Sequence, residues 1–188
     1  MPPRIKICGF TDADNAAAVA RLGVDYIGVN RWPGSKRFAS DQVAGAVAAR
    51  ARAAGAAVVG VYVDAPISTL VDDARELGLA VLQLHGDETA ETVDATVRAL
   101  AQAQLAQVEV WKALPISAAD QAAAQRARLQ QFAQAGASCC LLDAATAARG
   151  GSGQTIDWGR ASTLVATATV PVGLAGGLHP DNVAAAVA

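Results

Sequence analysis

Short apolar segments alternate with longer helical segments along the whole chain. Seven of the apolar segments are rich in β-branched residues and have the length of a strand; they are 4–8, 25–30, 57–63, 80–85, 108–114, 138–144 and 170–177. Each is followed by a segment with capping residues or alanine-rich periodicity, such as 40–54 and 118–135. Seven βα repeats in strict order predict a parallel sheet with right-handed crossovers.

Parallel strands at this spacing form either an open doubly wound sheet or a closed barrel. Polar or reactive residues stand at or just after several predicted strand ends: Cys8, Asn30, Asp64, His85, Lys112 and Asp143. A ring of strand ends drawn from the whole chain favours the mouth of a barrel, because an open sheet gathers its chemistry at one crevice. We therefore expect an α/β protein with the (β/α)8 TIM-barrel fold, as a single domain over residues 1–188.

Composition narrows the range of partners. Apolar residues make up 53% of the chain, charged residues 17%, and the formal net charge is -2, so nothing indicates a nucleic-acid surface or disorder. Three cysteines, two of them adjacent, argue against a disulfide framework and favour a reducing compartment. The N-terminus lacks the pattern of a secretory signal, and Pro171 divides the longest uncharged stretch. We expect a cytoplasmic protein that binds small molecules and neither nucleic acid nor membrane.

Two strand ends carry side chains that could transfer protons. Cys8 ends the first predicted strand, just before a helix start at Thr11 and Asp12 whose N–H groups would favour a thiolate. It could be a base or a nucleophile, although a lone cysteine is more often a small buried hydrophobe. Asp143 ends the sixth predicted strand and could act as an acid or base, or equally cap the following helix or pair with a cation.

Two glycine-rich segments follow the sixth and seventh predicted strands. Their glycines are Gly150, Gly151 and Gly153 in "RGGSGQTIDW", and Gly176 and Gly177 in "AGGLHPDN". Glycine lets the backbone approach an anion closely, and N–H groups at a helix start can bind phosphate. Loops after two late strands match the usual phosphate site of barrel enzymes, so we expect a phosphate group there.

Two further polar residues lie near strand ends. Arg37 follows Lys36 in the loop after the second predicted strand and could bind a carboxylate through two parallel hydrogen bonds, or belong to a solvated basic turn. His85 could shuttle protons or bind a substrate, although a lone histidine is more often structural. Neither residue decides the function by itself.

The segments "KICGFTD", "SKRF", "LQLHGDE", "LLDA" followed by "GGSGQTIDW", and "PVGLAGGLHPDNV" together resemble the phosphoribosylanthranilate isomerase family of tryptophan biosynthesis. The motifs occur in the family's order and spacing over nearly the whole chain. The resemblance implies an Amadori rearrangement of N-(5-phosphoribosyl)anthranilate to 1-(2-carboxyphenylamino)-1-deoxyribulose 5-phosphate, with no metal or redox cofactor. It also implies a monomer or a homodimer whose partner is the small sugar-phosphate substrate.

The same resemblance implies a role for each candidate residue. Asp143 would protonate the furanose ring oxygen, and Cys8 would then remove the proton from C2. Arg37 would hold the anthranilate carboxylate, and His85 would support the edge of the site. The two glycine loops would hold the sugar phosphate.

The chain departs from the family pattern at two places. Arg31 stands where many members have an apolar or aromatic residue, so we expect an additional charge at the rim of the anthranilate pocket. The family pattern also continues into an eighth strand, a further phosphate loop and a final helix. Only seven βα units are visible in this sequence, so we expect the barrel to be incomplete at its C-terminus.

Two other functions remain open from the sequence. Another phosphate-binding barrel isomerase or lyase would keep the glycine loops, but an imine-forming lyase needs a strand-end lysine, and Lys112 lies in no recognised signature. A non-catalytic binder of phosphate ligands would keep the anion loops without turnover.

Overall fold

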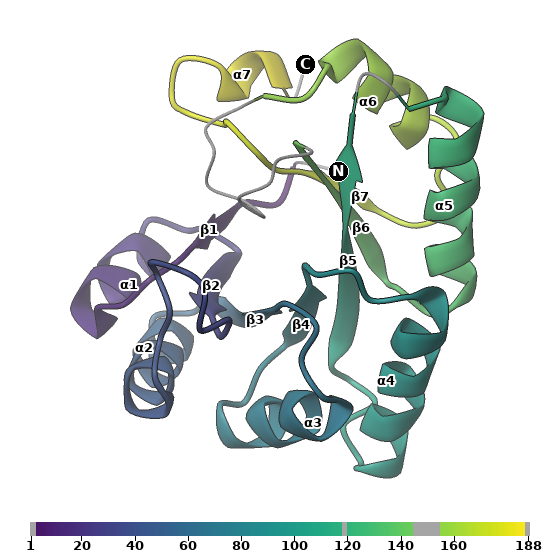
Figure 1. The fold of residues 1–188 in the computed structure, drawn as a ribbon. Helices are drawn as coiled ribbons and strands as arrows, with labels where there is room; N and C mark the ends of the chain where they lie inside the picture. Colours follow the sequence, from purple (N-terminus) through teal and green to yellow (C-terminus); the bar gives the residue numbers. More distant parts are fainter. Residues whose placement is uncertain (1–2, 118–119, 145–154, 187–188) are drawn as a thin grey trace. The chain divides into compact units, whose positions relative to one another are not determined.

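The computed structural model describes residues 3–117, 120–144 and 155–186, in which strands and helices alternate as predicted (Figure 1). The strands of this part are β1 (Lys6–Cys8), β2 (Tyr26–Asn30), β3 (Ala57–Tyr62), β4 (Val81–Leu84), β5 (Glu109–Ile116), β6 (Cys139–Ala144) and β7 (Val172–Leu174). The helices are α1 (Ala13–Ala20), α2 (Asp41–Ala53), α3 (Ile67–Glu76), α4 (Ala90–Gln102), α5 (Ala122–Gln134), α6 (Trp158–Val165) and α7 (Val183–Ala186). All seven predicted strands are confirmed.

The chain divides into two compact units. The first contains Met1–Glu88 and Ala95–Val110, and the second contains Thr89–Asp94 and Trp111–Ala188. None of the helices in the part of the chain described above is long and apolar enough to cross a membrane.

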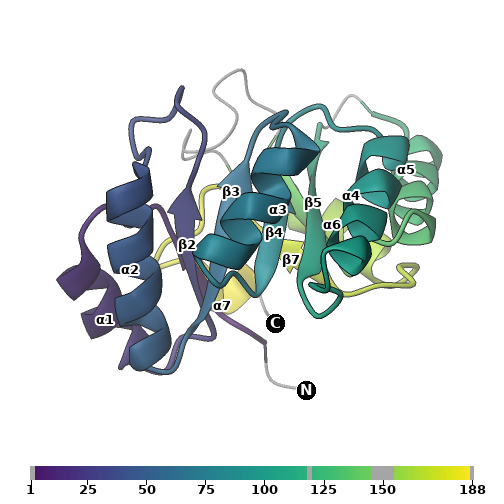
Figure 2. The same cartoon turned by 90° about the horizontal axis from the view of Figure 1, so that it is seen from below.

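In the first unit, β1 to β4 pair in parallel and in chain order. Helices α1, α2 and α3 cover one face of these strands (Figure 2). The Tyr62 hydroxyl donates to Asp73 of α3, so the Tyr62 side of the sheet is the helix face. Since side chains alternate along a strand and register partners share a face, Cys8 and Gln83 lie on the opposite face.

Two predicted helix starts are confirmed by capping hydrogen bonds in this unit. The Asp12 carboxylate accepts from the Asn15 N–H at 2.7 Å, and the Ser40 hydroxyl accepts from the Val43 N–H at 3.4 Å. These bonds satisfy N–H groups that a helix start leaves unpaired. They fix where the loops after β1 and β2 end, and both loops carry candidate site residues.

In the second unit, β5, β6 and β7 pair in parallel. Lys112 is fully buried and pairs in register with Cys140. Its ammonium donates to the Ala113 carbonyl at 3.0 Å and lies 5.7 Å from the ring centroid of Phe132 in α5. The prediction that Lys112 stands at a strand end is wrong, because β5 continues to Ile116 and Lys112 faces α5 from its middle.

Candidate active site

Cys8 is the last residue of β1, and its thiol is free and half-buried. The residue that makes room for this thiol is Gly28, its register partner in β2. A Cβ atom at position 28 would lie 2.6 Å from the Cys8 Sγ, closer than the two atoms can approach. Gly28 was not among the predicted site residues. A glycine inside a strand is the signal that could have found it, because such glycines mark close approaches.

Arg37 reaches across the same strand end. Its Nη1 donates to the Cys8 carbonyl oxygen at 3.0 Å, although the side chain is exposed. Gly9 lies beneath it with φ +90°, and a Cβ there would lie 2.6 Å from Arg37 Nη1. The structure therefore brings two of the predicted residues, Cys8 and Arg37, together. An exposed guanidinium at the Cys8 backbone can bind an anionic group of a substrate.

His85 follows β4, and its backbone N–H donates to the Tyr62 carbonyl at 2.7 Å. Its ring Nδ1 lies 2.8 Å from Nε2 of Gln83, a residue that is only 4% exposed. The buried Gln83 Oε1 has no hydrogen-bond partner among the described residues. Gln83 is a second residue that the sequence prediction missed. A glutamine inside an otherwise apolar strand could have indicated it, since buried polar groups need a partner.

The loop around His85 is held by acidic side chains. The Glu88 carboxylate accepts from the N–H of Gly86 at 2.9 Å and from that of Asp64 at 2.9 Å. The Asp64 carboxylate in turn accepts from the Asp87 N–H at 2.7 Å. Asp64, a predicted strand-end residue, therefore ties the loop after β3 to the loop that carries His85.

Arg31 does not place a charge at the rim of a pocket, so that expectation is wrong. Its Nε donates to Asp73 at 2.8 Å, its Nη2 contacts Asp41, and its Nη1 donates to the Ala39 carbonyl at 2.7 Å. The side chains of Arg31 and Asp73 are each only 10% exposed. The physical reason is strand alternation: Arg31 follows Asn30 and takes the helix face, opposite to Cys8.

The charged group of Arg31 is stabilised by its hydrogen-bonded acidic partners. Burial alone would lower the pKa of Arg31, but Asp73 and Asp41 outweigh that effect and hold the pKa above its usual value. Burial raises the pKa of the Tyr62 hydroxyl well above its usual range, and the neighbouring Asp73 raises it further. Arg31 therefore stays charged, and Tyr62 stays protonated as the donor to Asp73.

In the second unit, Asp143 lies one residue before the end of β6 and is 7% exposed. Its Oδ1 accepts from the Ala144 N–H at 2.8 Å. Cys140 shares the α5 face with Lys112, so Asp143, three residues later, lies on the opposite face. The carboxyl group thus points away from the helix layer, as a group acting inside a barrel must.

The loop after β7 contains Gly176 with φ +80° and Gly177 with φ +63°. Residues with side chains rarely adopt these angles, so the turn requires glycine here. Asn182 closes the loop, since its amide donates to the Gly177 carbonyl at 2.9 Å and accepts from the His179 N–H at 2.8 Å. Gly150, Gly151 and Gly153, the other predicted phosphate-binding glycines, lie outside the described residues.

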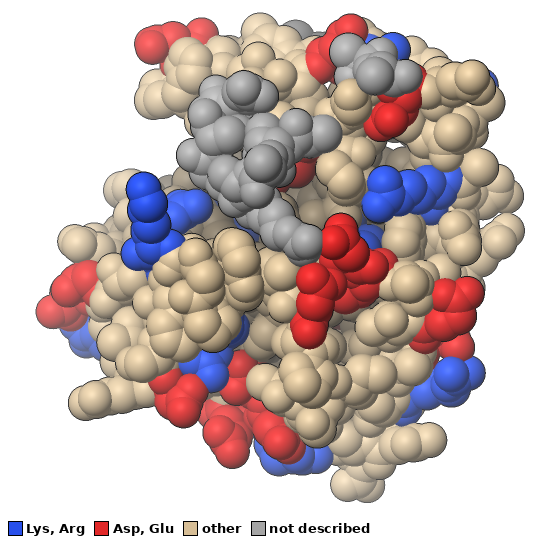
Figure 3. Space-filling view, viewed as in Figure 1, with Lys and Arg blue, Asp and Glu red and all other residues tan. Residues whose placement is uncertain are grey.

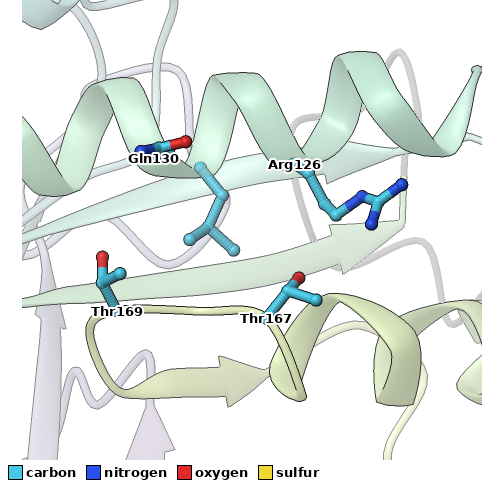
Figure 4. A pocket seen from close by; sticks show the side chains of 5 residues that line it. Arg126, Gln130, Thr167 and Thr169 are labelled. Carbon is cyan, nitrogen blue, oxygen red and sulfur yellow. The ribbon is translucent and has the colours of Figure 1, made fainter.

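A surface pocket of about 170 Å³ lies elsewhere in the second unit (Figure 4). Its lining comes from α5 and from the segment that leads into β7: Arg126, Leu129, Gln130, Thr167 and Thr169. Because it lies where the chain enters β7, it is not at the strand end that carries Asp143. Among residues 3–117, 120–144 and 155–186, no three His, Cys, Asp or Glu side chains are arranged to hold a metal ion.

Comparisons with known proteins agree with the predicted family. The family model for N-(5'-phosphoribosyl)anthranilate (PRA) isomerase matches residues 5–188. The N-(5'-phosphoribosyl)anthranilate isomerase of Myxococcus xanthus is 36% identical over 187 residues, covering 100% of this chain and 81% of the relative. This chain thus spans about four-fifths of the length of that relative.

Two solved structures extend the comparison to the fold. Phosphoribosyl anthranilate isomerase from Thermus thermophilus superposes with a TM-score of 0.78 at 30% identity, covering 98% of this chain and 82% of that one. A second structure is a phosphoribosyl anthranilate isomerase in complex with reduced 1-(o-carboxyphenylamino)-1-deoxyribulose 5-phosphate. It superposes with a TM-score of 0.71 at 26% identity, covering 99% of this chain and 81% of that one. The fold is that of the (β/α)8 barrel, and the chain belongs to the phosphoribosylanthranilate isomerase family.

Proposed function

We propose that the protein catalyses the Amadori rearrangement of N-(5-phosphoribosyl)anthranilate, with Cys8 as general base and Asp143 as general acid. The observation that carries the proposal is the end of β1, where the Cys8 thiol occupies the space left by Gly28 and the Arg37 guanidinium crosses the same backbone. A proton acceptor and an anion-binding group thereby lie within one strand end. Family membership supplies the substrate and the reaction type.

The first chemical step opens the ring. Asp143 donates its proton to the furanose oxygen, the bond between that oxygen and C1 breaks, and the lone pair of the anilino nitrogen forms an iminium at C1. Asp143 is only 7% exposed, and this burial keeps competing water away from the ring oxygen. Because Asp143 lies on the face opposite α5, it is available to a ligand rather than to the helix layer.

The second step removes the proton from C2. The iminium withdraws electrons and acidifies this C–H bond, so a modest base such as a thiolate suffices. Cys8 takes the proton, the electron pair forms the C1–C2 double bond of an enolamine, and tautomerisation gives the ketone. These two steps move protons and electron pairs within one substrate, so the reaction requires no redox cofactor.

Recognition divides between the two ends of the substrate. Arg37 binds the anthranilate carboxylate, because a planar guanidinium and a carboxylate match in two parallel hydrogen bonds. His85, held by Gln83, supports the edge of the site. The loop at Gly176 and Gly177 binds the sugar phosphate through its backbone N–H groups, and the glycines at 150, 151 and 153 are assigned to the same phosphate by the family resemblance alone.

We further propose that the protein works in the cytoplasm as a monomer or a homodimer. On the face shown in Figure 3, basic side chains lie singly or in small groups among neutral and acidic ones. This distribution supports a small-molecule enzyme rather than a nucleic-acid binder. An imine-forming lyase is disfavoured, because Lys112 is fully buried beneath α5.

Turnover of the fluorescent substrate tests the proposal. The purified full-length protein, at a concentration far below that of the substrate, should convert N-(5-phosphoribosyl)anthranilate completely, with loss of fluorescence. Saturable binding of the substrate without conversion would contradict the proposal and support a non-catalytic binder. Conversion should persist after dialysis against a chelator, since no step needs a metal.

A further inference from the structure

The segment between β2 and α2 is built around Asn30. The Asn30 side chain accepts from the Trp32 N–H at 3.0 Å and donates to the Ser35 hydroxyl at 3.1 Å. The Asn30 backbone carbonyl accepts from the Ala39 N–H at 2.8 Å. The Ser35 hydroxyl also accepts from the Arg37 N–H at 3.1 Å. Hydrogen bonds to Asn30 and Ser35 therefore fix the backbone of the segment that carries Arg37.

Arg31 contacts the C-terminal part of this segment. Its guanidinium donates to the Ala39 carbonyl at 2.7 Å and lies 6.0 Å from the ring centroid of Phe38. Both contacts fall on the two residues that directly follow Arg37. The backbone of Arg31 is itself fixed, because its N–H donates to the Val61 carbonyl of β3 at 2.8 Å.

The other end of the Arg31 guanidinium is anchored in the helix layer. Asp73 of α3 accepts from Nε at 2.8 Å and from Nη2 at 3.3 Å, and Asp41 at the start of α2 accepts from Nη2. The Tyr62 hydroxyl donates to the same Asp73 at 2.9 Å. One planar group thus joins β2, α2 and α3 to the segment at Phe38 and Ala39.

We infer that Arg31 is a positioning residue for Arg37, setting the affinity for the carboxylate end of the substrate without touching the substrate itself. This inference rests on the proposed role of Arg37. It follows from the contacts of Arg31, which hold both Asp73 and the backbone next to Arg37. The planar fork of arginine is needed, because a lysine ammonium cannot reach three differently placed acceptors along one plane.

A double-mutant cycle tests the inference by steady-state kinetics on the full-length protein. Arg31→Lys keeps the charge beside Asp73, so it avoids the unpaired buried carboxylate that Arg31→Met would leave. We expect Arg31→Lys to raise KM about tenfold and to change kcat less than about twofold, the pattern of lost binding rather than lost chemistry. In an Arg37→Met background, Arg31→Lys should not raise KM further.

The matched control is Arg50→Lys, which alters an ion pair of α2 with Asp14 whose side chains are 53% and 81% exposed. It should leave KM unchanged. An unchanged KM in Arg31→Lys would overturn the inference, provided Arg37→Met raises KM. An equal rise of KM in both backgrounds would also overturn it, because Arg31 would then act independently of Arg37. If Arg37→Met itself leaves KM unchanged, the carboxylate role of Arg37 is wrong, and the inference falls with it.

Discussion

At the scale of single residues, strand alternation decides which side chains serve the site. Cys8 lies on the face of the first unit opposite the helices, whereas Arg31, next to Asn30, turns toward α2 and α3. The period of two along β2 was readable in the sequence and would have placed Arg31 with the buried Ile27 and Val29. The partners Asp41 and Asp73 were not readable, because they depend on how helices pack across the sheet.

The role of Asp143 gives a prediction at this scale. Asp143→Asn removes the acidic proton but keeps an oxygen that can accept from the Ala144 N–H, so the fold should be retained. We expect kcat to fall by about 10²-fold or more, the range for a positioned general acid. The measurement is steady-state turnover alongside thermal melting. Asp157→Asn, a helix N-cap substitution in the same unit, is the control and should leave kcat unchanged.

A wild-type rate in Asp143→Asn would show that this carboxyl is structural. If the variant loses kcat but is also unfolded by thermal melting, the loss does not support a catalytic role for Asp143. Turnover and melting are therefore measured on the same preparation.

At the scale of elements, the βα alternation predicted the seven strands, and the strand ends were placed less well. β5 runs through Pro115 to Ile116, although proline usually ends a strand. Pro115 pairs in register with Asp143, so the neighbouring strand carries the element past the proline. The sequence prediction ended this strand at Leu114, and Lys112 was therefore wrongly assigned to a strand end.

The pairing of β1 with β2 gives a prediction at this scale. Gly28→Ala would place a Cβ 2.6 Å from the Cys8 Sγ and force the thiol out of its position. We expect a loss of about 1–3 kcal/mol in the free energy of unfolding, and a fall in kcat that exceeds any rise in KM. Gly45→Ala in α2 is the matched control, because a Cβ there meets nothing within 4 Å.

Urea denaturation and steady-state kinetics measure both effects. The control substitution should stabilise the protein slightly, since alanine favours a helix more than glycine does. Unchanged stability and turnover in Gly28→Ala would contradict the assigned role of Gly28.

At the scale of the whole molecule, the fold class and the family were predictable because they depend on repeats and motifs spread along the chain. Cys8, Arg37, His85 and Asp143 all come from such motifs. Gly28 and Gln83 were missed because their roles arise from neighbours in space: a thiol on the adjacent strand and a histidine ring two residues later. Close packing of that kind leaves only a weak trace in a single sequence.

The stability of the protein at alkaline pH gives a prediction at this scale. Burial raises the pKa of the Cys140 thiol to about 12, the neighbouring Cys139 adds to the rise, and Lys112 opposes it. In the unfolded chain the thiol ionises near pH 8.5, so above that pH the unfolded state loses a proton that the folded state keeps. This contribution to stability is complete below about pH 8.5 and is lost progressively as the pH rises toward 12.

We expect the loss from this thiol to reach about 2 kcal/mol at pH 10. Urea denaturation at pH 7 and pH 10 measures it, with Cys140→Ala compared with the wild type. The variant should lose less stability between the two pH values, and Cys139→Ala should keep most of the wild-type decrease. An equal decrease in Cys140→Ala and the wild type would show that another group controls the alkaline transition.

The most direct test of the central claim is kcat of Cys8→Ala with N-(5-phosphoribosyl)anthranilate as substrate. Alanine fits the space beside Gly28, so the fold should be kept, but no group remains there to take the C2 proton. We expect kcat to fall by about 10²-fold or more while KM changes less, because Arg37 still binds the carboxylate. Near-normal turnover in Cys8→Ala would contradict the account.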